Sequence, residues 1–198
     1  KKNIFLIFEK LLSRLTDAIV CVSQDDYKSV VKYNFISNNK VFLINNGIDI
    51  DYFSSIDRSE LERIKKEIHW DKDFFYISTI ARLEHPKEFI SILRSVKQLV
   101  DNDYKVKLLI LGDGSLKEDI KINIKKLGLE NAISLLGFIT KIKYYINLSG
   151  AVILSSQWEG MPTVALETFA GKRVFIGSNV IGVKNIVKNN HNGFLFDF

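Results

Sequence analysis

The chain has 198 residues, of which 46% are apolar and 26% are charged, enough for a real core in one large domain, or in one domain plus a piece of another. A net charge of +5, from 28 Lys and Arg against 23 Asp and Glu, favours an anionic ligand or an anionic membrane surface, or serves solubility alone. This excess is too small and too dispersed for a nucleic-acid-binding stripe. The single cysteine, Cys21, excludes a disulfide scaffold and a zinc cluster built on thiolates, and it fits a reducing, cytosolic setting.

The first region, residues 1–46, begins with an apolar segment that could be mistaken for a signal peptide. Its apolar core "IFLIF" is too short and no small-residue cleavage site follows, so we expect a helix instead. No apolar run reaches the roughly 18 residues of a transmembrane helix. The expected elements are a helix at 3–15, a strand at 17–23 that buries Cys21, a helix at 24–35 with its cap near Ser23, and a strand at 40–46. The sequence "NNGID" predicts a turn at 45–49 with Gly47 at a positive φ.

Residues 47–72 hold a polar helical stretch, "RSELERIKKEI", which we interpret as a linker and connecting helix. From residue 73 onward, apolar runs typical of strands alternate with helical patterns. The expected strands are 74–81, 105–112, 132–137, 151–156, 173–177 and 193–196, and the expected helices are 86–100, 115–127, 140–148, 162–170 and 180–188. Near-continuous apolar strands, each followed by a helix, predict an α/β fold with a doubly wound, parallel, Rossmann-like sheet in residues 73–198.

Ligands of such sheets bind at the carboxyl ends of the strands, so the loops there are the places to search. After the first strand, "RLEHPKE" puts Arg82 at the strand end and Lys87 at the start of the next helix, where two cations beside free helix N–H groups suit a diphosphate. A solvated Arg and a helix-start Lys are the alternative. After the second strand, "GDGS" places Gly112 and Gly114 where the backbone can approach a ligand or turn tightly. Lys117 stands where a dinucleotide fingerprint has its third glycine, which disfavours NAD.

The loop after the third strand, at Phe138, offers a backbone edge for a base. Lys141 and Lys143 could add charge there, but an amphipathic helix with Tyr144 or Tyr145 packed inward is the favoured interpretation.

The stretch "WEGMPTVALE" follows the fourth strand and separates two carboxylates by eight positions. Pro162 suits the first turn of a helix, which leaves Glu159 in the preceding loop and Glu167 over one turn into the helix, pointing back toward that loop. The free N–H groups of Met161, Thr163 and Val164 would lie between the carboxylates at the positive helix end. The alternative makes Glu159 a cap and Glu167 a surface residue, although the apolar neighbours of Glu167 argue against full exposure.

Together these segments resemble the retaining nucleotide-sugar glycosyltransferases of family 4, the group 1 glycosyltransferases, which have the two-domain GT-B fold. The resembling segments, "NNGIDIDYF", "ARLEHPKE", "LLILGDGSLKEDI", "ISLLGF", "SSQWEGMPTVALETFAGKRV" and "NGFLF", occur in the family's order from about residue 41 to 198. The resemblance implies that residues 1–46 are the end of an N-terminal acceptor domain and that residues 73–198 are the donor-binding domain. It also implies that relatives carry more chain on both sides, so we expect weak donor binding and little or no turnover by these 198 residues.

The resemblance further assigns roles to the site residues. Arg82 and Lys87 would hold the donor diphosphate, Glu159 would contact hydroxyls of the donor sugar near its anomeric carbon, and Glu167 would bind the ribose hydroxyls. The backbone from Gly160 through Met161, Pro162 and Thr163 to Val164 would touch sugar and phosphate, with Gly112 and Gly114 nearby and the loop at Phe138 meeting the base.

The reaction implied is sugar transfer from a UDP- or GDP-sugar to a glycan or lipid-linked acceptor with retention of configuration, often described as front-face displacement. No cofactor and no metal is expected, and the three histidines His69, His85 and His191 are scattered. The location implied is cytoplasmic, with peripheral association at the inner membrane face left open, and no nucleic-acid partner. A non-catalytic nucleotide or glycan binding module and, less favoured, a dinucleotide-binding Rossmann protein are the competing hypotheses.

Several positions depart from the family pattern and bear on donor identity and activity rather than on the fold. The departing positions are Ala81, Glu88, Gly150, Ser155, Arg173, Ile181 and Asn185.

Overall fold

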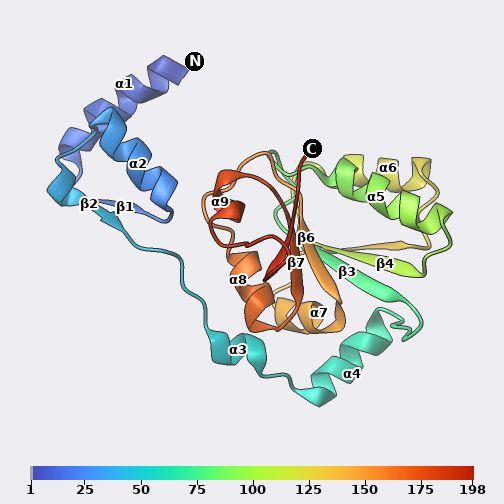
Figure 1. The fold of residues 1–198 in the computed structure, drawn as a ribbon. Coiled ribbons are helices and arrows are strands. Elements are labelled where there is room, and N and C mark those ends of the chain that lie inside the picture. The colour runs from blue at the N-terminus through green and yellow to red at the C-terminus, as the bar shows by residue number, and fades with distance from the viewer. Residues whose placement is uncertain (1) are drawn as a thin grey trace.

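The computed structural model describes residues 2–198, without the side chains of residues 2–5 and of Arg14, and contains two parallel sheets (Figure 1). The N-terminal region comprises α1 (Lys2–Leu12), the 3₁₀ turn η1 (Ser13–Leu15), β1 (Ile19–Cys21), α2 (Gln24–Tyr33), η2 (Asn38–Lys40) and β2 (Val41–Leu43). Strands β1 and β2 form a two-stranded parallel sheet in which Cys21 is buried, as expected. The Ser23 hydroxyl accepts a hydrogen bond from the Asp26 N–H, which confirms the predicted cap of α2.

A long connection, α3 (Ile50–Ser54) and α4 (Arg58–Glu67) then lead into the second sheet (Figure 1). The prediction of a positive φ at Gly47 is wrong: the positive-φ glycines are Gly112, Gly114, Gly128 and Gly137. The chain needs no tight turn at Gly47, because it runs without helix or strand from β2 to α3.

The second sheet has six parallel strands in the order β5-β4-β3-β6-β7-β8, which confirms the doubly wound prediction. Its elements are β3 (Phe75–Ile80), α5 (Phe89–Asp101), β4 (Val106–Leu111), α6 (Lys117–Lys126), β5 (Ile133–Gly137), α7 (Ile142–Leu148), β6 (Ala151–Leu154), α8 (Thr163–Ala170), β7 (Val174–Ser178), α9 (Ile181–Lys184) and β8 (Gly193–Phe196). All five of these helices begin one to three residues later than predicted. The largest shift is that of α5, which starts at Phe89 rather than at residue 86, and Pro162 is the N-cap of α8 rather than part of its first turn.

Both faces of this sheet are covered, as its apolar strands require. In β4, Leu108 and Ile110 face α5 and α6, whereas Leu109 and Leu111 face α4 and α7. A third cluster joins β6 and β7 to α7, α8 and α9 around Phe175, which is fully buried. The predicted inward packing of Tyr144 and Tyr145 is also confirmed. The carboxyl ends of six fixed strands therefore form one edge, at which loops of different sequence position meet.

Within the described residues, the helices are all too short or too polar to cross a membrane.

Candidate active site at the switch point of the sheet

Strand order reverses between β3 and β6, because β4 and β5 extend the sheet on one side and β7 and β8 on the other. Loops that follow the two strands at such a point diverge and leave a crevice for a ligand. The loop after β3 holds Arg82 and Lys87, and the loop after β6 holds Glu159 to Pro162. The two most informative motifs of the sequence thus flank one crevice.

The loops after β3 and β6 are joined to each other by main-chain hydrogen bonds. The Glu88 N–H donates to the Ser155 carbonyl at 2.9 Å, and the Gln157 N–H donates to the Pro86 carbonyl at 3.1 Å. Lys87 and Ser156 form an isolated antiparallel bridge. This pairing ties Lys87 and Glu88 to the neighbouring loop, and Glu88 has the non-helical dihedrals φ −107° and ψ 67°, which explains why α5 begins only at Phe89.

Lys87 contacts Glu159 across this seam. The Lys87 ammonium group donates to the Glu159 carboxylate, and the side chains are only 18% and 13% exposed. The prediction that Lys87 lies at a helix start is therefore wrong. Lys87 instead faces a carboxylate of the neighbouring loop. An ion pair held this far from solvent fixes the orientation of both side chains, since separating them would leave a poorly solvated charge.

Arg82 lies in a different environment. Its side chain is 86% exposed, and its guanidinium group is 3.6 Å from the Glu84 carboxylate. It stands at the rim of a cavity of about 350 Å³ that opens at the ends of β3, β4 and β5. The other lining residues are mostly apolar and comprise Ile80, Ala81, Leu111, Gly112, Asp113, Phe138 and Ile139. The structure thus brings Arg82 together with Gly112 and Phe138, and Lys87 together with Glu159.

Gly112 and Gly114 allow two strand-end loops to approach closely. Their φ values are +146° and +152°. A Cβ on Gly112 would lie 1.8 Å from the Ala81 carbonyl oxygen, and one on Gly114 would lie 2.5 Å from the Leu83 carbonyl oxygen. Both glycines are therefore required by backbone packing beside Arg82, whether or not a ligand also touches them.

The loop between β6 and α8 presents unpaired donors. Pro162 is the N-cap of α8 with φ −71° and ψ 114°. Within residues 2–198, the N–H groups of Gly160, Met161, Thr163 and Val164 donate to no described acceptor. An anion or a sugar hydroxyl at this helix end would meet several donors and the positive end of the helix dipole.

Glu167 lies one turn further along α8 and is half-buried, as expected from its apolar neighbours. Burial raises the pKa of the Glu167 carboxyl above its usual value, and a hydrogen bond from Thr163 opposes this shift. Desolvation without a cation partner is typical of a carboxylate kept for a ligand rather than for stability.

The two lysines near Phe138 serve the domain itself. Lys141 donates to the Glu60 carboxylate at 2.9 Å, and Lys143 donates to the Ser55 carbonyl at 2.9 Å. Arg63 and Lys141 together lower the pKa of Glu60 to about 2. Neither lysine lines the cavity at Arg82.

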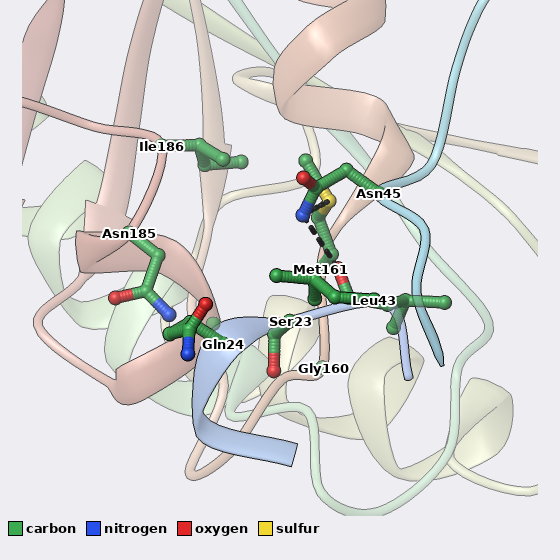
Figure 2. A pocket seen from close by; sticks show the side chains of 10 residues that line it. Ser23, Gln24, Leu43, Asn45, Gly160, Met161, Asn185 and Ile186 are labelled. Carbon is green, nitrogen blue, oxygen red and sulfur yellow. Dashed lines mark hydrogen bonds between the residues drawn. The ribbon is translucent and has the colours of Figure 1, made fainter. Parts of the chain in front are cut away.

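A second cavity lies between the N-terminal region and the loop after β6 (Figure 2). Its volume is about 340 Å³, and its walls include Ser23, Gln24 and Asn45 from the N-terminal region and Met161 and Asn185 from the second. The neighbouring Asn46 side chain donates to the Met161 carbonyl at 3.0 Å. Of these residues, Met161 belongs to the predicted donor site, whereas the sequence predicts Ser23 only as a helix cap and Asn45 only as part of a turn; their positions after β1 and β2 are the one signal for a site there.

Gly182 of α9 supports the same loop. A Cβ there would lie 2.2 Å from the Gly160 carbonyl oxygen and 2.4 Å from the Glu159 carbonyl oxygen. The backbone of Glu159 thus packs against Gly182 of α9, and its side chain contacts Lys87. Across residues 2–198, His, Cys, Asp and Glu do not gather in any group of three that could hold a metal ion.

Comparison with known proteins agrees with this geometry. Residues 60–198 match the family model of the glycosyl transferases group 1. The chain is 27% identical over 204 residues to UDP-Gal:alpha-D-GlcNAc-diphosphoundecaprenol alpha-1,3-galactosyltransferase of Escherichia coli, covering 100% of this chain and 52% of that protein. It is 30% identical over 169 residues to an uncharacterized glycosyltransferase of Methanocaldococcus jannaschii, covering 85% of this chain and 41% of the relative. The chain thus spans about half the length of these curated relatives.

Among solved structures, HepE from Anabaena in complex with UDP and glucose superposes with a TM-score of 0.84 at 20% identity, over 96% of this chain and 52% of HepE. This likeness establishes a GT-B type of Rossmann-like fold. The family match over residues 60–198 and the arrangement of the loops after β3 and β6 lead to one conclusion: the chain belongs to the group 1 glycosyltransferases.

Proposed function

We propose that this chain is the donor-binding part of a retaining glycosyltransferase that moves a sugar from a UDP-sugar to a glycan or lipid-linked acceptor. The observation that carries the proposal is the Lys87–Glu159 ion pair at the switch point, beside the unpaired N–H groups that open α8. Two comparisons favour UDP: HepE was solved with UDP, and the Escherichia coli relative is named for UDP-Gal. A GDP-sugar is the alternative donor.

In this proposal the base occupies the cavity at the ends of β3, β4 and β5. The cavity of about 350 Å³ has apolar walls for a flat ring, and Phe138 at its edge is exposed. Arg82 at the rim then reaches the diphosphate with its planar fork, and Lys87 adds a point charge from the other loop. Glu167 accepts the ribose hydroxyls, for which a desolvated carboxylate without a cation partner is suited.

The proposed mechanism depends on where charge develops in the transition state of sugar transfer. When the bond between the anomeric carbon and the phosphate oxygen breaks, negative charge grows on the diphosphate, and Arg82, Lys87 and the N-terminus of α8 stabilise it. These groups supply the positive charge from the protein itself, so we propose a reaction that needs no metal. Glu159, paired with Lys87, orients sugar hydroxyls and stabilises positive charge at the anomeric carbon. The departing phosphate oxygen takes the acceptor proton, and the configuration is retained.

The wider assignments are part of the same proposal. Residues 1–46 are the end of an acceptor domain, residues 47–72 a linker with a connecting helix, and residues 73–198 the donor domain. Polysaccharide or lipid-linked glycan synthesis at the cytoplasmic face of a membrane, with peripheral contact, fits the names of the relatives, of which one acts on a diphosphoundecaprenol-linked sugar.

Calorimetric titration of the chain with UDP, GDP and NAD tests the donor assignment. We expect UDP to bind, and Arg82→Ala to weaken UDP about tenfold or more, since a charge-assisted hydrogen bond contributes roughly 1.5–3 kcal/mol. Arg173→Ala is the matched control, because Arg173 is bound to the Asn147 carbonyl in another part of the domain. Binding of NAD in place of UDP would overturn the proposal.

A second measurement distinguishes a glycosyltransferase from a non-catalytic binding module. A longer version of the protein that includes the flanking domains should hydrolyse or transfer its donor, and Glu159→Ala should abolish that activity. If the longer protein binds UDP but neither hydrolyses nor transfers its donor, the chain is part of a binding module; if it is active and Glu159→Ala leaves that activity unchanged, the proposed role of Glu159 is wrong.

A further inference from the structure

We propose that the cleft beside Glu159 receives the terminal sugar of the acceptor and that Asp25 and Asp26 restrict this sugar to one without negative charge. The inference rests on the proposed transferase function and names its acceptor class. The cleft is a cavity of about 490 Å³ between the first turn of α2, the loop after β6 and the start of α9. The lining residues that bear on the argument are Asp25, Asp26, Trp158, Glu159, Gly160 and Lys184.

Position argues for an acceptor rather than for a donor. The nucleotide cavity lies at the ends of β3, β4 and β5, whereas this cleft lies on the other side of the switch point, toward α9. Glu159, placed at the anomeric carbon in the proposed function, is part of the cleft wall. A sugar in the cleft would therefore approach the donor sugar from the side opposite the nucleotide.

The polar groups of the cleft suit sugar hydroxyls. Asp25 accepts a hydrogen bond from the Asn185 amide at 2.7 Å, and Asp26 accepts one from the Ser23 hydroxyl at 2.6 Å. Each carboxylate is thus oriented but keeps unused lone pairs for hydroxyl donors. The Asp26 Oδ2 atom lies 3.9 Å from the place that a Cβ on Gly160 would occupy, so it faces the loop that carries Glu159. The indole of Trp158, 57% exposed, offers a flat apolar face for the C–H groups of a sugar ring.

The negative charges of Asp25 and Asp26 disfavour an acceptor sugar that is itself negatively charged. Glu159 is balanced by Lys87, but Asn185 and Ser23 are neutral donors. Among the described residues that line the cleft, Lys184 alone opposes the formal charges of Asp25 and Asp26. The adjoining cavity drawn in Figure 2 adds no cation: its polar side chains are the amides of Gln24, Asn45 and Asn185 and the Ser23 hydroxyl, and none of its described lining residues is charged. A uronic acid or phosphorylated sugar would bring a third negative group beside two fixed carboxylates.

The test compares methyl glycosides of N-acetylglucosamine, glucosamine and glucuronic acid in NMR titrations of the 198-residue chain with UDP present. We expect the neutral and the cationic glycosides to bind at least about tenfold more tightly than the glucuronide. Asp25→Asn with Asp26→Asn should bring this ratio below about threefold, because asparagine keeps an acceptor oxygen for each neighbour and removes only the charge. Lys184→Gln should widen the ratio. Asp119→Asn, a charge removal on α6 outside the cleft, is the control and should leave it unchanged.

Each possible result of these titrations either supports or overturns the proposed acceptor site. Glucuronide binding as tight as that of the neutral glycosides, no binding of any glycoside, or a ratio insensitive to the two aspartates would overturn the inference. Binding of UDP is measured in the same samples without glycoside. A chain that binds UDP but no glycoside leaves the proposed function standing and rejects the acceptor site, whereas failure of UDP to bind rejects the proposed function itself. Unfolding curves of all variants exclude loss of fold as the cause.

Discussion

Gly112→Ala should separate packing from ligand contact at the loop after β4. An added Cβ would lie 1.8 Å from the Ala81 carbonyl oxygen and must move to at least 3.0 Å, and the obstacle is backbone rather than a flexible side chain. The φ of +146° adds strain for any residue with a Cβ. Overpacking costs about 1–3 kcal/mol and a strained φ about 1–3 kcal/mol, so we expect a loss of roughly 2–6 kcal/mol in the free energy of unfolding.

Gly128→Ala is the matched control. Gly128 has a φ of +65°, but a Cβ there would meet nothing within 4 Å, so only the φ strain of about 1–2 kcal/mol remains. Urea unfolding followed by circular dichroism measures both variants. Because Ala81 precedes Arg82, Gly112→Ala should also weaken UDP binding, whereas Gly128→Ala should not. If both variants lose the same stability, the close approach of the loops after β3 and β4 does not constrain the domain as argued.

Three further outcomes are expected. In a double-mutant cycle, Lys87→Met and Glu159→Gln should each lower the free energy of unfolding by about 1–3 kcal/mol, because the partner that remains is a poorly solvated charge. The loss in the double variant should be clearly smaller than the sum of the two single losses. Additive losses in urea unfolding would contradict a stabilising contact between Lys87 and Glu159. Glu167→Gln should raise Tm at pH 7 but not near pH 4: a raised carboxyl pKa means that the folded state loses stability as pH rises from the unfolded pKa through the folded one, and glutamine removes this loss. A pH-independent Tm difference would refute the desolvation of Glu167. Arg173→Ala should cost about 1–2 kcal/mol through its two bonds, at 3.1 and 2.7 Å, to the Asn147 carbonyl, and Arg173→Lys should recover part of it; equal stability of all three chains would show that this contact contributes nothing.

Much of the fold could be predicted from interactions between residues that are close in the sequence. The run "VKLLIL" of β4 is apolar on both faces because the strand is covered on both faces, and this continuity distinguishes a parallel interior strand from a helix or a half-exposed strand. The capping role of Ser23 and the burial of Cys21 follow from neighbours within a few residues. Right-handed crossovers between such units predict a doubly wound sheet, and the structure supplies the strand order.

Local chemistry failed where distant segments compete. Nothing within three residues of Lys87 forbids a helix start, yet the main chain there pairs with residues 155–157 and remains extended. Gly47 lies in a segment that resembles a turn, but the connection from β2 to α3 spans two regions of the chain and has no use for one. Both errors have the same origin, since the deciding partner lies far away in sequence.

By itself, the sequence determined the strands and the longer helices but not α3, and it determined which loops carry carboxylates and cations and that these loops gather at one edge of a parallel sheet. Only the tertiary structure decided which charges meet: Lys87 pairs with Glu159, 72 positions away, while Arg82 turns to the cavity at Phe138. It alone placed Asp26 opposite Gly160 and joined Asp25 to Asn185 across 160 positions. The reason is physical: side-chain period and turn chemistry act over a few residues, whereas ion pairs and cavities depend on how strands distant in sequence are ordered in the sheet.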